Sequence, residues 1–311
     1  METPRRDIAG IAYGLGAYLW WGLCPIYFKA VAHVPPAEVL AHRIVWSVVL
    51  LGALLALRGR TGEIWSAARQ PRVLRSLLAS TLLVTVNWFT FIWAVSNDRI
   101  LAASFGYFMN PLVTVLLGVL VLGERLRRGQ AVSLVLAVVG VALMGWRLGA
   151  VPMVSLALAF SFGLYGLIRK TAAVGATVGL TIECALLAPL ALAALAFLDG
   201  DGALVFGHLD RRTDVLLALS GVVTALPLVW FAAGARRLRL ATMGFLHYVT
   251  PSGQFLLAVL VYGEPFSGRE LAPFLLIWAA LALYSLDLAR SQRRPPRDGL
   301  SGATGRSSPR G

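Results

Sequence analysis

Four ionisable side chains lie inside long apolar stretches of this sequence: His42, Arg43, Glu183 and His247. A charged side chain at the centre of a membrane helix costs about 2.5–3.5 kcal/mol on insertion scales, so residues at such positions are candidates for function. A guanidinium can bind an anionic group of a solute, and a carboxylate or an imidazole can carry a proton or bind a cation. We therefore predict that Arg43 binds solute and that Glu183 and His42 couple protons or ions to its movement, with His247 as a further candidate for proton binding.

A structural role is an open alternative for both charged groups. Arg43 could bond freed backbone carbonyls or extend towards the membrane surface, and Glu183 could be protonated and structural. Each residue is predicted to lie a few residues from the start of its span, Arg43 nearer the outer face of the membrane and Glu183 nearer the inner face, at levels that differ by roughly 10 Å or more at a rise of about 1.5 Å per residue. A salt bridge between Arg43 and Glu183 is therefore not expected.

Two prolines, Pro111 and Pro251, lie near the middle of apolar runs. Proline removes a backbone donor and leaves the carbonyl four residues earlier without its helical partner. We predict that both prolines kink their helices and that polar side chains around the kinks line a central pocket; the alternative is that they only bend helices for packing. The predicted solute-binding residues are Arg43, Asn87, Trp88, Tyr107, Asn110, His247, Tyr248 and Gln254.

The elements that would carry these residues are membrane-spanning helices. Hydrophobic residues make up 58% of the chain and charged residues 14%, and a span needs about 20 mostly apolar residues. Backbone groups in lipid must find hydrogen bonds within the protein, so we predict an all-α polytopic membrane protein with ten transmembrane helices. The ten apolar runs are 8–29, 38–57, 75–95, 101–122, 130–148, 152–168, 178–198, 214–234, 241–262 and 271–288.

The net charge of +13 does not indicate a nucleic-acid partner, because the basic residues follow the predicted topology. If Arg5 and Arg6 are cytoplasmic, most other basic residues, Arg169 and Lys170 among them, also fall in cytoplasmic segments, as the positive-inside rule requires. We expect a multi-pass protein of the bacterial inner membrane with both termini in the cytoplasm. Residues 289–311, rich in Arg, Pro, Gly and Ser, are predicted to form a disordered basic tail.

A shift of 140 residues aligns much of the second half of the sequence with the first, without a gap from Asn87 to Glu124, and places Glu124 on Glu264 and Arg99 on Arg239. The segment VLVLGE ends at the first of these glutamates and VLVYGE ends at the second. A basic segment, RLRR, follows the first glutamate but not the second. Because arginine is favoured on the cytoplasmic side, the two glutamates are predicted to lie at opposite faces of the membrane, each near the interface.

Each half contains five predicted spans, the first repeat at 1–148 and the second at 149–288. Five is an odd number, so the second copy must enter the membrane from the opposite side. Inverted repeats of this kind can exchange conformations and thus open alternately to either side of the membrane, with a solute site near the midplane.

The ordered segments AYLWWGLCPIYFK, EVLAHRIVWS, SFGYFMNPLV, LGERLRR, AFSFGLYGLIRK, RLRLATMGFLHYVTP and YGE resemble the EamA-type repeats of the drug/metabolite transporter superfamily, and its RarD-type permeases in particular. The resemblance covers roughly residues 8–288. It implies ten helices with inverted pseudo-symmetry and a central cavity lined by the third, fourth, eighth and ninth spans. It also implies export as the usual direction, and it leaves the solute undefined.

We therefore predict a secondary transporter that exports a small organic metabolite or drug-like solute by alternating access in the lipid bilayer, with protons as a candidate coupling ion. The alternative is a membrane pore, or a lipid or solute facilitator without ion coupling. An enzyme is not expected, because HExxH, GxSxG and the phosphate-binding loop GxxxxGK[ST] are absent from the sequence. We predict no cofactor and no metal site, because the four histidines do not form a metal-ligand pattern.

Overall fold

The computed structural model describes residues 3–96, 100–148, 153–263 and 268–292, and this part of the chain consists of helices joined by turns and loops, without a strand. The helices are α1 (Thr3–Ala30), α2 (Pro36–Leu57), α3 (Thr61–Ala68), α4 (Pro71–Ser96), α5 (Ile100–Leu120), α6 (Arg128–Leu148), α7 (Met153–Thr171), α8 (Ala176–Gly200), α9 (Arg211–Ala235), α10 (Leu240–His247), α11 (Val249–Leu256), the π-helical turn η1 (Leu257–Val261) and α12 (Gly268–Gln292).

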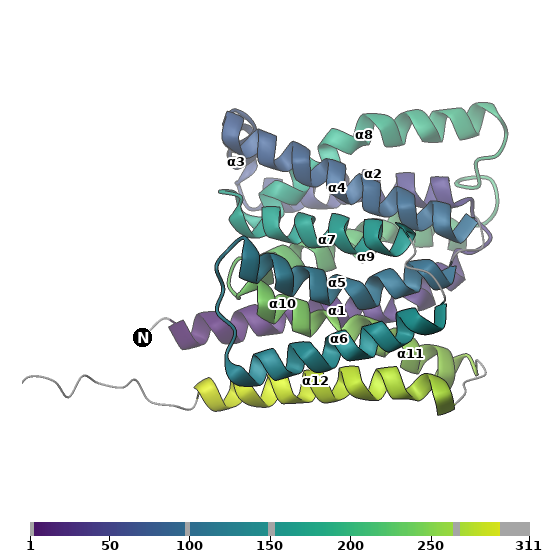
Figure 1. The fold of residues 1–311 in the computed structure, drawn as a ribbon. Helices are drawn as coiled ribbons and strands as arrows, with labels where there is room; N and C mark the ends of the chain where they lie inside the picture. The colour runs from purple at the N-terminus through teal and green to yellow at the C-terminus, as the bar shows by residue number, and fades with distance from the viewer. Residues whose placement is uncertain (1–2, 97–99, 149–152, 264–267, 293–311) are drawn as a thin grey trace, which may run out of the picture.

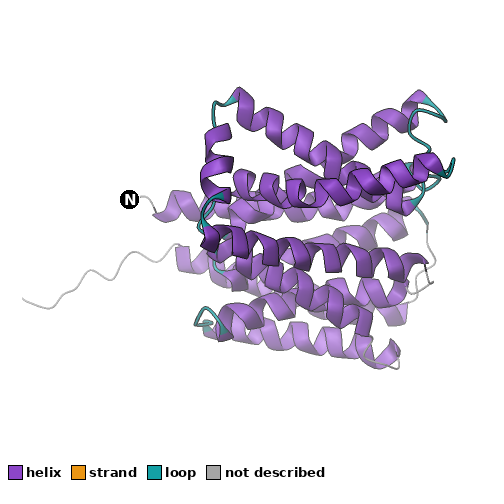
Figure 2. Ribbon diagram, turned by 90° about the horizontal axis from the view of Figure 1, so that it is seen from above, coloured by secondary structure: helices purple, strands orange, loops and turns teal. Residues whose placement is uncertain are grey.

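The long helices lie side by side and roughly parallel or antiparallel to one another, with α8 at one edge of the bundle and α6 and α12 at the other (Figure 1). The view turned by 90° shows the same helical bundle (Figure 2). The described residues of each predicted apolar run lie on helix except for one or two at the ends of the fourth and ninth runs, and the ninth run is divided between α10, α11 and η1. The sequence analysis did not anticipate α3, a short helix in the connection between α2 and α4.

Six helical stretches in the described residues are long and apolar enough to cross a membrane: Pro36–Leu57, Pro71–Phe91, Met153–Thr171, Ala176–Gly200, Arg211–Ala235 and Leu240–Val261. Shorter apolar helices at Gly106–Leu120 and Arg128–Leu143 accompany them. The chain is therefore a multi-pass, all-helical membrane protein. The ten-helix inverted repeat, the domain limits at residues 148 and 288 and the orientation of the termini stay predictions, and the predicted tail from residue 293 onward lies outside the described residues.

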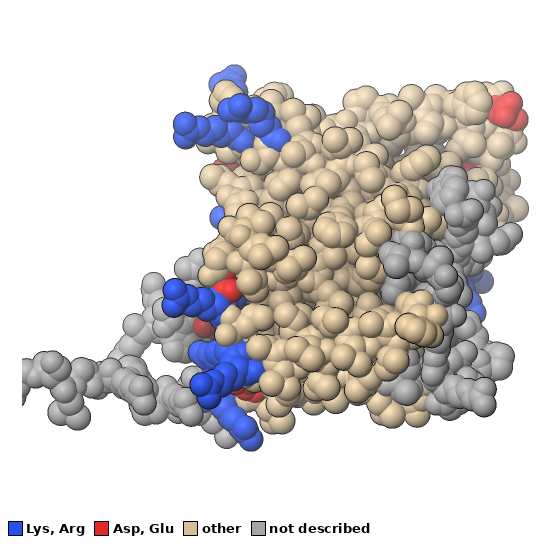
Figure 3. All heavy atoms as spheres, viewed as in Figure 1, with Lys and Arg blue, Asp and Glu red and all other residues tan. Residues whose placement is uncertain are grey.

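The outer surface of the bundle is apolar, as a lipid-facing surface must be. Leu82, Phe89, Leu190 and Leu260 are each more than 60% exposed, which would be costly in water but not against lipid tails. Lys and Arg side chains gather at the end of the bundle where the N-terminus lies, while the flank between the two ends is almost free of charge (Figure 3).

Glu124 joins the two halves of the chain at this basic end. Its carboxylate accepts the backbone N–H groups of Leu240 (2.6 Å) and Ala241 (2.9 Å), at the start of α10, and lies 3.8 Å from the Arg239 side chain. The positive end of a helix dipole stabilises an anion there. The sequence analysis placed Glu124 at the interface, and the structure adds that it caps a helix of the other half; Arg99 and Glu264 lie outside the described residues.

A second carboxylate connects the halves at the opposite end of the bundle. Glu38, in the first turn of α2, is fully buried and accepts the backbone N–H groups of Val205 (3.0 and 3.1 Å) and Phe206 (2.8 Å). These bonds hold the connection between α8 and α9 against α2. Nearby, Asp210 caps α9 by accepting from the Thr213 backbone and hydroxyl groups, and these bonds lower the pKa of the Asp210 carboxyl.

Close helix packing brings the halves together in the interior. At Gly221 of α9, a Cβ atom would lie 2.5 Å from the backbone carbon of Trp46 in α2, so glycine is required for this approach. The Ser47 hydroxyl next to Trp46 donates to the Gly221 carbonyl over 3.4 Å. The α2–α9 contact is thus one of the tightest between the two halves, and it sets the position of the polar residues on both helices.

Candidate functional site

Arg43 lies in the interior of the bundle, ~10 Å along α2 from Pro36 at a rise of about 1.5 Å per residue. Its Nε donates to the Thr224 hydroxyl of α9 over 2.8 Å. Its guanidinium carbon lies 5.5 Å from the ring centre of Phe28 in α1 and 5.1 Å from that of Trp88 in α4, within the range of cation–π attraction. Three helices besides its own therefore position this cation.

Arg43 has no carboxylate partner among the described residues. The ion pairs in that part of the chain join Glu38 to His42, Glu63 to Arg60, Glu183 to Arg169 and Glu124 to Arg239. Among the described residues, the ionisable groups that interact electrostatically with Arg43 are Cys24, Tyr27, Tyr107 and Cys184, and none of these four is a carboxylate. The predicted binding residues Trp88 and Tyr107 thus lie next to Arg43.

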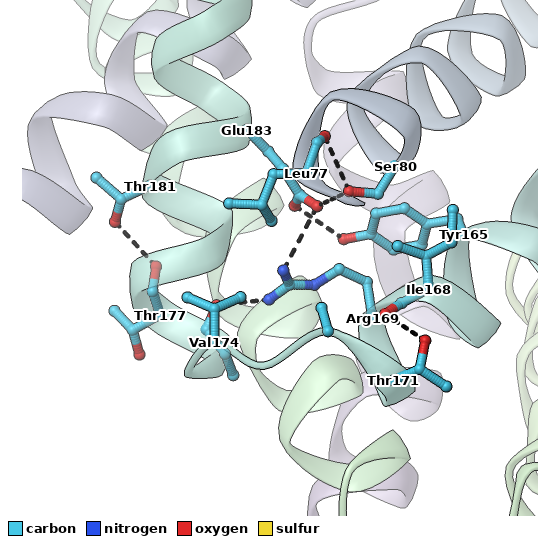
Figure 4. Close-up of polar contacts among 12 residues, drawn as sticks. Leu77, Ser80, Tyr165, Ile168, Arg169, Thr171, Val174, Thr177, Thr181 and Glu183 are labelled. Atoms are coloured by element: carbon cyan, nitrogen blue, oxygen red, sulfur yellow. Dashed lines mark hydrogen bonds and ion pairs between the residues drawn. The ribbon is translucent and has the colours of Figure 1, made fainter. Parts of the chain in front are cut away.

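Glu183, in α8, belongs to a buried polar cluster with Ser80 of α4 and Tyr165 and Arg169 of α7 (Figure 4). Arg169 Nη1 lies 3.5 Å from Glu183 Oε1, and both side chains are at most 2% exposed. The Ser80 hydroxyl donates to Glu183 Oε1 and the Tyr165 hydroxyl to Oε2 over 3.4 Å. Arg169 Nη2 also donates to the Ala176 carbonyl over 3.0 Å.

The sequence analysis missed the role of Arg169. It counted Arg169 with the charged residues outside the spans, whereas the structure places this residue inside α7 as the ion-pair partner of Glu183. Gly179, one helical turn before Glu183, leaves room for the Arg169 guanidinium, because a Cβ atom there would clash with Nη1. A glycine and a carboxylate spaced four residues apart, close in sequence to an arginine, are compatible with a buried ion pair.

His42 and Glu183 have different contact partners. It lies one helical turn from Glu38, with Nε2 3.8 Å from Glu38 Oε1, and its ring centre is 4.6 Å from that of Phe206. Neither nitrogen of the buried imidazole has a hydrogen-bond partner in the described part of the structure. The two predicted coupling residues therefore belong to separate clusters, at the starts of α2 and α8.

The side-chain amides of Asn87 and Asn110 both bond to α7. Asn87 Nδ2 donates to the Leu158 carbonyl and the Ser161 hydroxyl, each over 3.0 Å, and Asn110 Nδ2 donates to the Ala159 carbonyl over 2.9 Å. In this conformation these amides hold α4 and α5 against α7. Their role in solute binding stays a prediction.

The three predicted residues of the ninth apolar run point to different neighbours. His247 stacks on Tyr18 of α1, with ring centres 4.7 Å apart and an interplanar angle of 16°. Tyr248, which separates α10 from α11, is buried among apolar side chains of α5, α6 and α12. Gln254 Nε2 donates to the Trp21 carbonyl of α1 over 3.2 Å. Of the three, His247 and Gln254 face the first helix.

The two predicted kink positions differ in the structure. The run that contains Pro251 is interrupted at Tyr248, three residues before the proline, and continues through a π-helical turn. The helix that contains Pro111, α5, is continuous from Ile100 to Leu120. Pro111 and Pro251 occupy equivalent positions in the sequence, but the helix around Pro251 is interrupted and the helix around Pro111 is not.

Two other prolines, Pro25 in α1 and Pro227 in α9, explain two long-range hydrogen bonds. Each leaves the carbonyl four residues earlier without its helical donor. The carbonyl freed by Pro25 is that of Trp21, which Gln254 bonds. The carbonyl freed by Pro227 is that of Val223, which the Trp20 indole bonds over 3.2 Å. The side chains of each half thus satisfy backbone groups freed by prolines of the other half.

Replacement of Gln254 by leucine is expected to destabilise the protein by about 1–2 kcal/mol, because the Trp21 carbonyl loses its donor in an environment without water. Thermal unfolding of the purified protein in detergent measures this cost. In a Pro25→Ala background the backbone N–H of residue 25 can bond Trp21, so the same replacement should cost less. An equal cost in both backgrounds would contradict the assignment of the Gln254 bond to the proline.

Comparison with known proteins places these features in a family. The model of the EamA-like transporter family matches residues 8–146. A relative from Vibrio cholerae serotype O1, named "Uncharacterized transporter", is 45% identical over 287 residues, which are 92% of this chain and 95% of the relative. Protein RarD of Escherichia coli strain K12 is 41% identical over 290 residues, covering 93% and 98% of the two chains.

More distant relatives agree with this placement. The "Chloramphenicol-sensitive protein RarD" of Pseudomonas aeruginosa is 34% identical over 296 residues, which are 94% of this chain and 98% of the relative. A protein of known crystal structure matches 93% of this chain and 100% of its own with a TM-score of 0.72 at 21% sequence identity, which shows a shared fold. From the family match and these long, similar relatives, the chain is a membrane transporter rather than an enzyme, and it belongs to the EamA-like transporter family as a RarD-type permease.

Proposed function

We propose that this chain is a secondary transporter that exports a small organic metabolite or drug-like solute by alternating access between two inverted repeats. The observation that carries the proposal is the pattern of helix packing. At the offset that places Glu124 on Glu264, α1 corresponds to α7, α2 to α8, α4 to α9, α5 to α10 with α11, and α6 to α12.

If each helix is replaced by its counterpart in the other half, each major contact between two helices becomes a contact that is also observed. The contact of α1 with α9 becomes that of α7 with α4, and the contact of α1 with α11 becomes that of α7 with α5; all four occur. The contacts α2–α8, α5–α10 and α6–α12 convert into themselves and also occur. This pattern is expected of two similar five-helix units related by a two-fold axis, which supports repeats at 1–148 and 149–288.

The proposed solute site surrounds Arg43, with walls from α1, α4, α5 and α9. The supporting observations are the unpaired guanidinium, the aromatic rings of Phe28 and Trp88 beside it and the nearby Tyr107 phenol. Glu183 occupies the equivalent position of the second repeat, because Arg43 in α2 and Glu183 in α8 are equally far from their helix starts. We propose that proton binding by Glu183 weakens its ion pair with Arg169. Protonation would then be coupled to separation of α4, α7 and α8, the helices that carry the buried polar cluster around Glu183.

Solute exchange distinguishes this carrier from the alternative of a pore or an uncoupled facilitator. Metabolite profiling of cells that lack or overproduce the protein should identify a solute that accumulates inside when the protein is absent. In proteoliposomes, that solute should show saturable counterflow, in which unlabelled solute inside drives uptake of labelled solute. Flux that rises linearly with concentration and shows no counterflow would contradict the carrier mechanism.

The inverted topology makes a separate prediction about two equivalent positions. In a variant with Cys24 and Cys184 replaced by serine, Arg127→Cys should react with a membrane-impermeant maleimide only after the cytoplasmic side is exposed. Ser267→Cys, at the equivalent position of the second repeat, should react in intact spheroplasts. The reason is the odd number of spans in each repeat, and reaction of both cysteines from the same side would refute the inverted arrangement together with cytoplasmic termini.

A further inference from the structure

We infer that the group bound at Arg43 is the carboxylate of a small monovalent organic acid whose remaining part is aromatic or otherwise apolar. This inference rests on the proposed function, since it names the class of solute for the same site. It is carried by the charge, the unused hydrogen-bond donors and the aromatic surroundings of Arg43.

The first step is the missing counter-charge. An arginine taken out of water inside a membrane protein is normally compensated by a carboxylate, because the desolvation cost of an unpaired ion is several kcal/mol or more. Arg169, whose side chain is fully buried, follows this rule through Glu183. Arg43 has no such partner in the described residues, so a ligand that brings a negative charge would complete the site.

The second step is the geometry of the guanidinium. Nε is engaged by the Thr224 hydroxyl, and the planar group lies over the rings of Phe28 and Trp88. Within the described residues, no hydrogen bond engages Nη1 or Nη2 of Arg43, whose N–H groups lie along the edge of the plane. That edge is the part of a guanidinium that binds a carboxylate with two parallel hydrogen bonds.

The third step is the number of charges. Within the part of the chain that the structure describes, no second lysine or arginine is among the groups that interact electrostatically with Arg43. A monovalent carboxylate would neutralise the single guanidinium, whereas a divalent phosphate would leave a net negative charge in an apolar interior. The site is therefore suited to a carboxylate rather than to a phosphate ester.

The fourth step is the surrounding apolar surface. Trp88 packs against a core cluster that includes Tyr18, Cys184 and Phe231, and Cys184 is itself within electrostatic reach of Arg43. Trp21 and Phe162 of the same cluster contact each other edge to face, with ring centres 5.5 Å apart. An aryl or alkyl group attached to the carboxylate would thus lie next to aromatic side chains.

Cys24 provides a reporter for this site without any transport measurement. It is partly exposed, whereas Cys184 is buried, and these are the two cysteines of the chain. Purified full-length protein carrying Cys184→Ser would be alkylated with N-ethylmaleimide, and the rate at Cys24 followed by mass spectrometry. The probes are phenylacetate, benzoate and hexanoate, each compared with its neutral amide, and phenylphosphonate as a divalent anion.

We expect the carboxylates to slow alkylation of Cys24 at least fivefold at millimolar concentration and to raise the thermal unfolding temperature, while their amides and phenylphosphonate change neither. Arg43→Gln should remove both effects, and Arg58→Gln, at the exposed end of the same helix, should retain them. If each carboxylate behaves like its amide in both measurements, or if Arg43→Gln retains the difference, the inference is wrong. The proposed carrier function would not be affected by that result, because it is tested separately by counterflow of the solute that metabolite profiling identifies.

Discussion

Replacement of Arg43 by glutamine is expected to abolish export of the profiled solute while the amount of folded protein in the membrane stays unchanged. Glutamine can still bond the Thr224 hydroxyl that Arg43 contacts, but it removes the positive charge and the free edge of the guanidinium. Loss of one partner of a desolvated, charge-assisted contact costs about 2–5 kcal/mol, which is roughly a 30-fold or greater loss of affinity. Counterflow in proteoliposomes at matched protein content measures the effect.

Two control variants show whether the loss of export depends on the guanidinium of Arg43 or on the loss of any positive charge from α2. Arg43→Lys retains the charge but not the planar fork of donors, so it should keep part of the activity. Arg58→Gln removes a charge from the exposed C-terminal cap of α2 and should transport like the unmodified protein. Full activity of Arg43→Gln would remove Arg43 from the mechanism, and loss of folded Arg43→Gln protein would indicate that its role is structural.

Replacement of Arg169 by methionine is expected to destabilise the protein by about 3–5 kcal/mol, because it leaves the Glu183 carboxylate buried and without its counter-charge. Glu183→Leu should have a similar cost, since it leaves the Arg169 guanidinium unpaired against Gly179. Thermal unfolding in detergent, or the yield of monodisperse protein, measures both. The effect is large because both side chains are at most 2% exposed.

The double variant Arg169→Met with Glu183→Leu separates stability from coupling. Removal of both charges leaves no unpaired ion, so the double variant should be more stable than either single variant. If Glu183 also couples protons to transport, the double variant should still bind and exchange solute but lose any dependence of export on the proton gradient. Additive costs of the two single changes would contradict the ion pair, and a retained dependence on the gradient would contradict the coupling role.

The membrane nature and the helical elements of this protein could be predicted from local sequence alone. The described residues of each predicted apolar run lie almost entirely on helix in the structure, because a run of about 20 apolar residues has few alternatives in lipid. Boundaries differ by several residues where helices extend beyond the apolar part, as α1 does at its start from Thr3. The short helix α3 was missed because its eight residues, Thr61–Ala68, carry no comparable apolar signal.

The side-chain pairs of the candidate site could not be predicted in the same way. Glu183 was recognised as an ionisable residue within a span, but its partner Arg169 lies on a different helix, and the Ser80 hydroxyl that also bonds it comes from a third. Asn87 was predicted to face a pocket, and the structure shows its amide bonded to α7. Which face of a helix meets which neighbour depends on the rotation of each helix, and an almost uniformly apolar sequence contains little information about that rotation.

By itself, the sequence determined that the chain crosses a membrane several times as helices and that a few ionisable residues lie within the apolar runs. Only the tertiary structure decided which of these charges are compensated: Glu183 by Arg169, and Arg43 by no carboxylate in the described residues. The physical reason is that hydrophobic burial and backbone hydrogen bonding act along each helix and can be read locally. The pairing of charges depends on the distance between side chains of different helices, which packing alone sets.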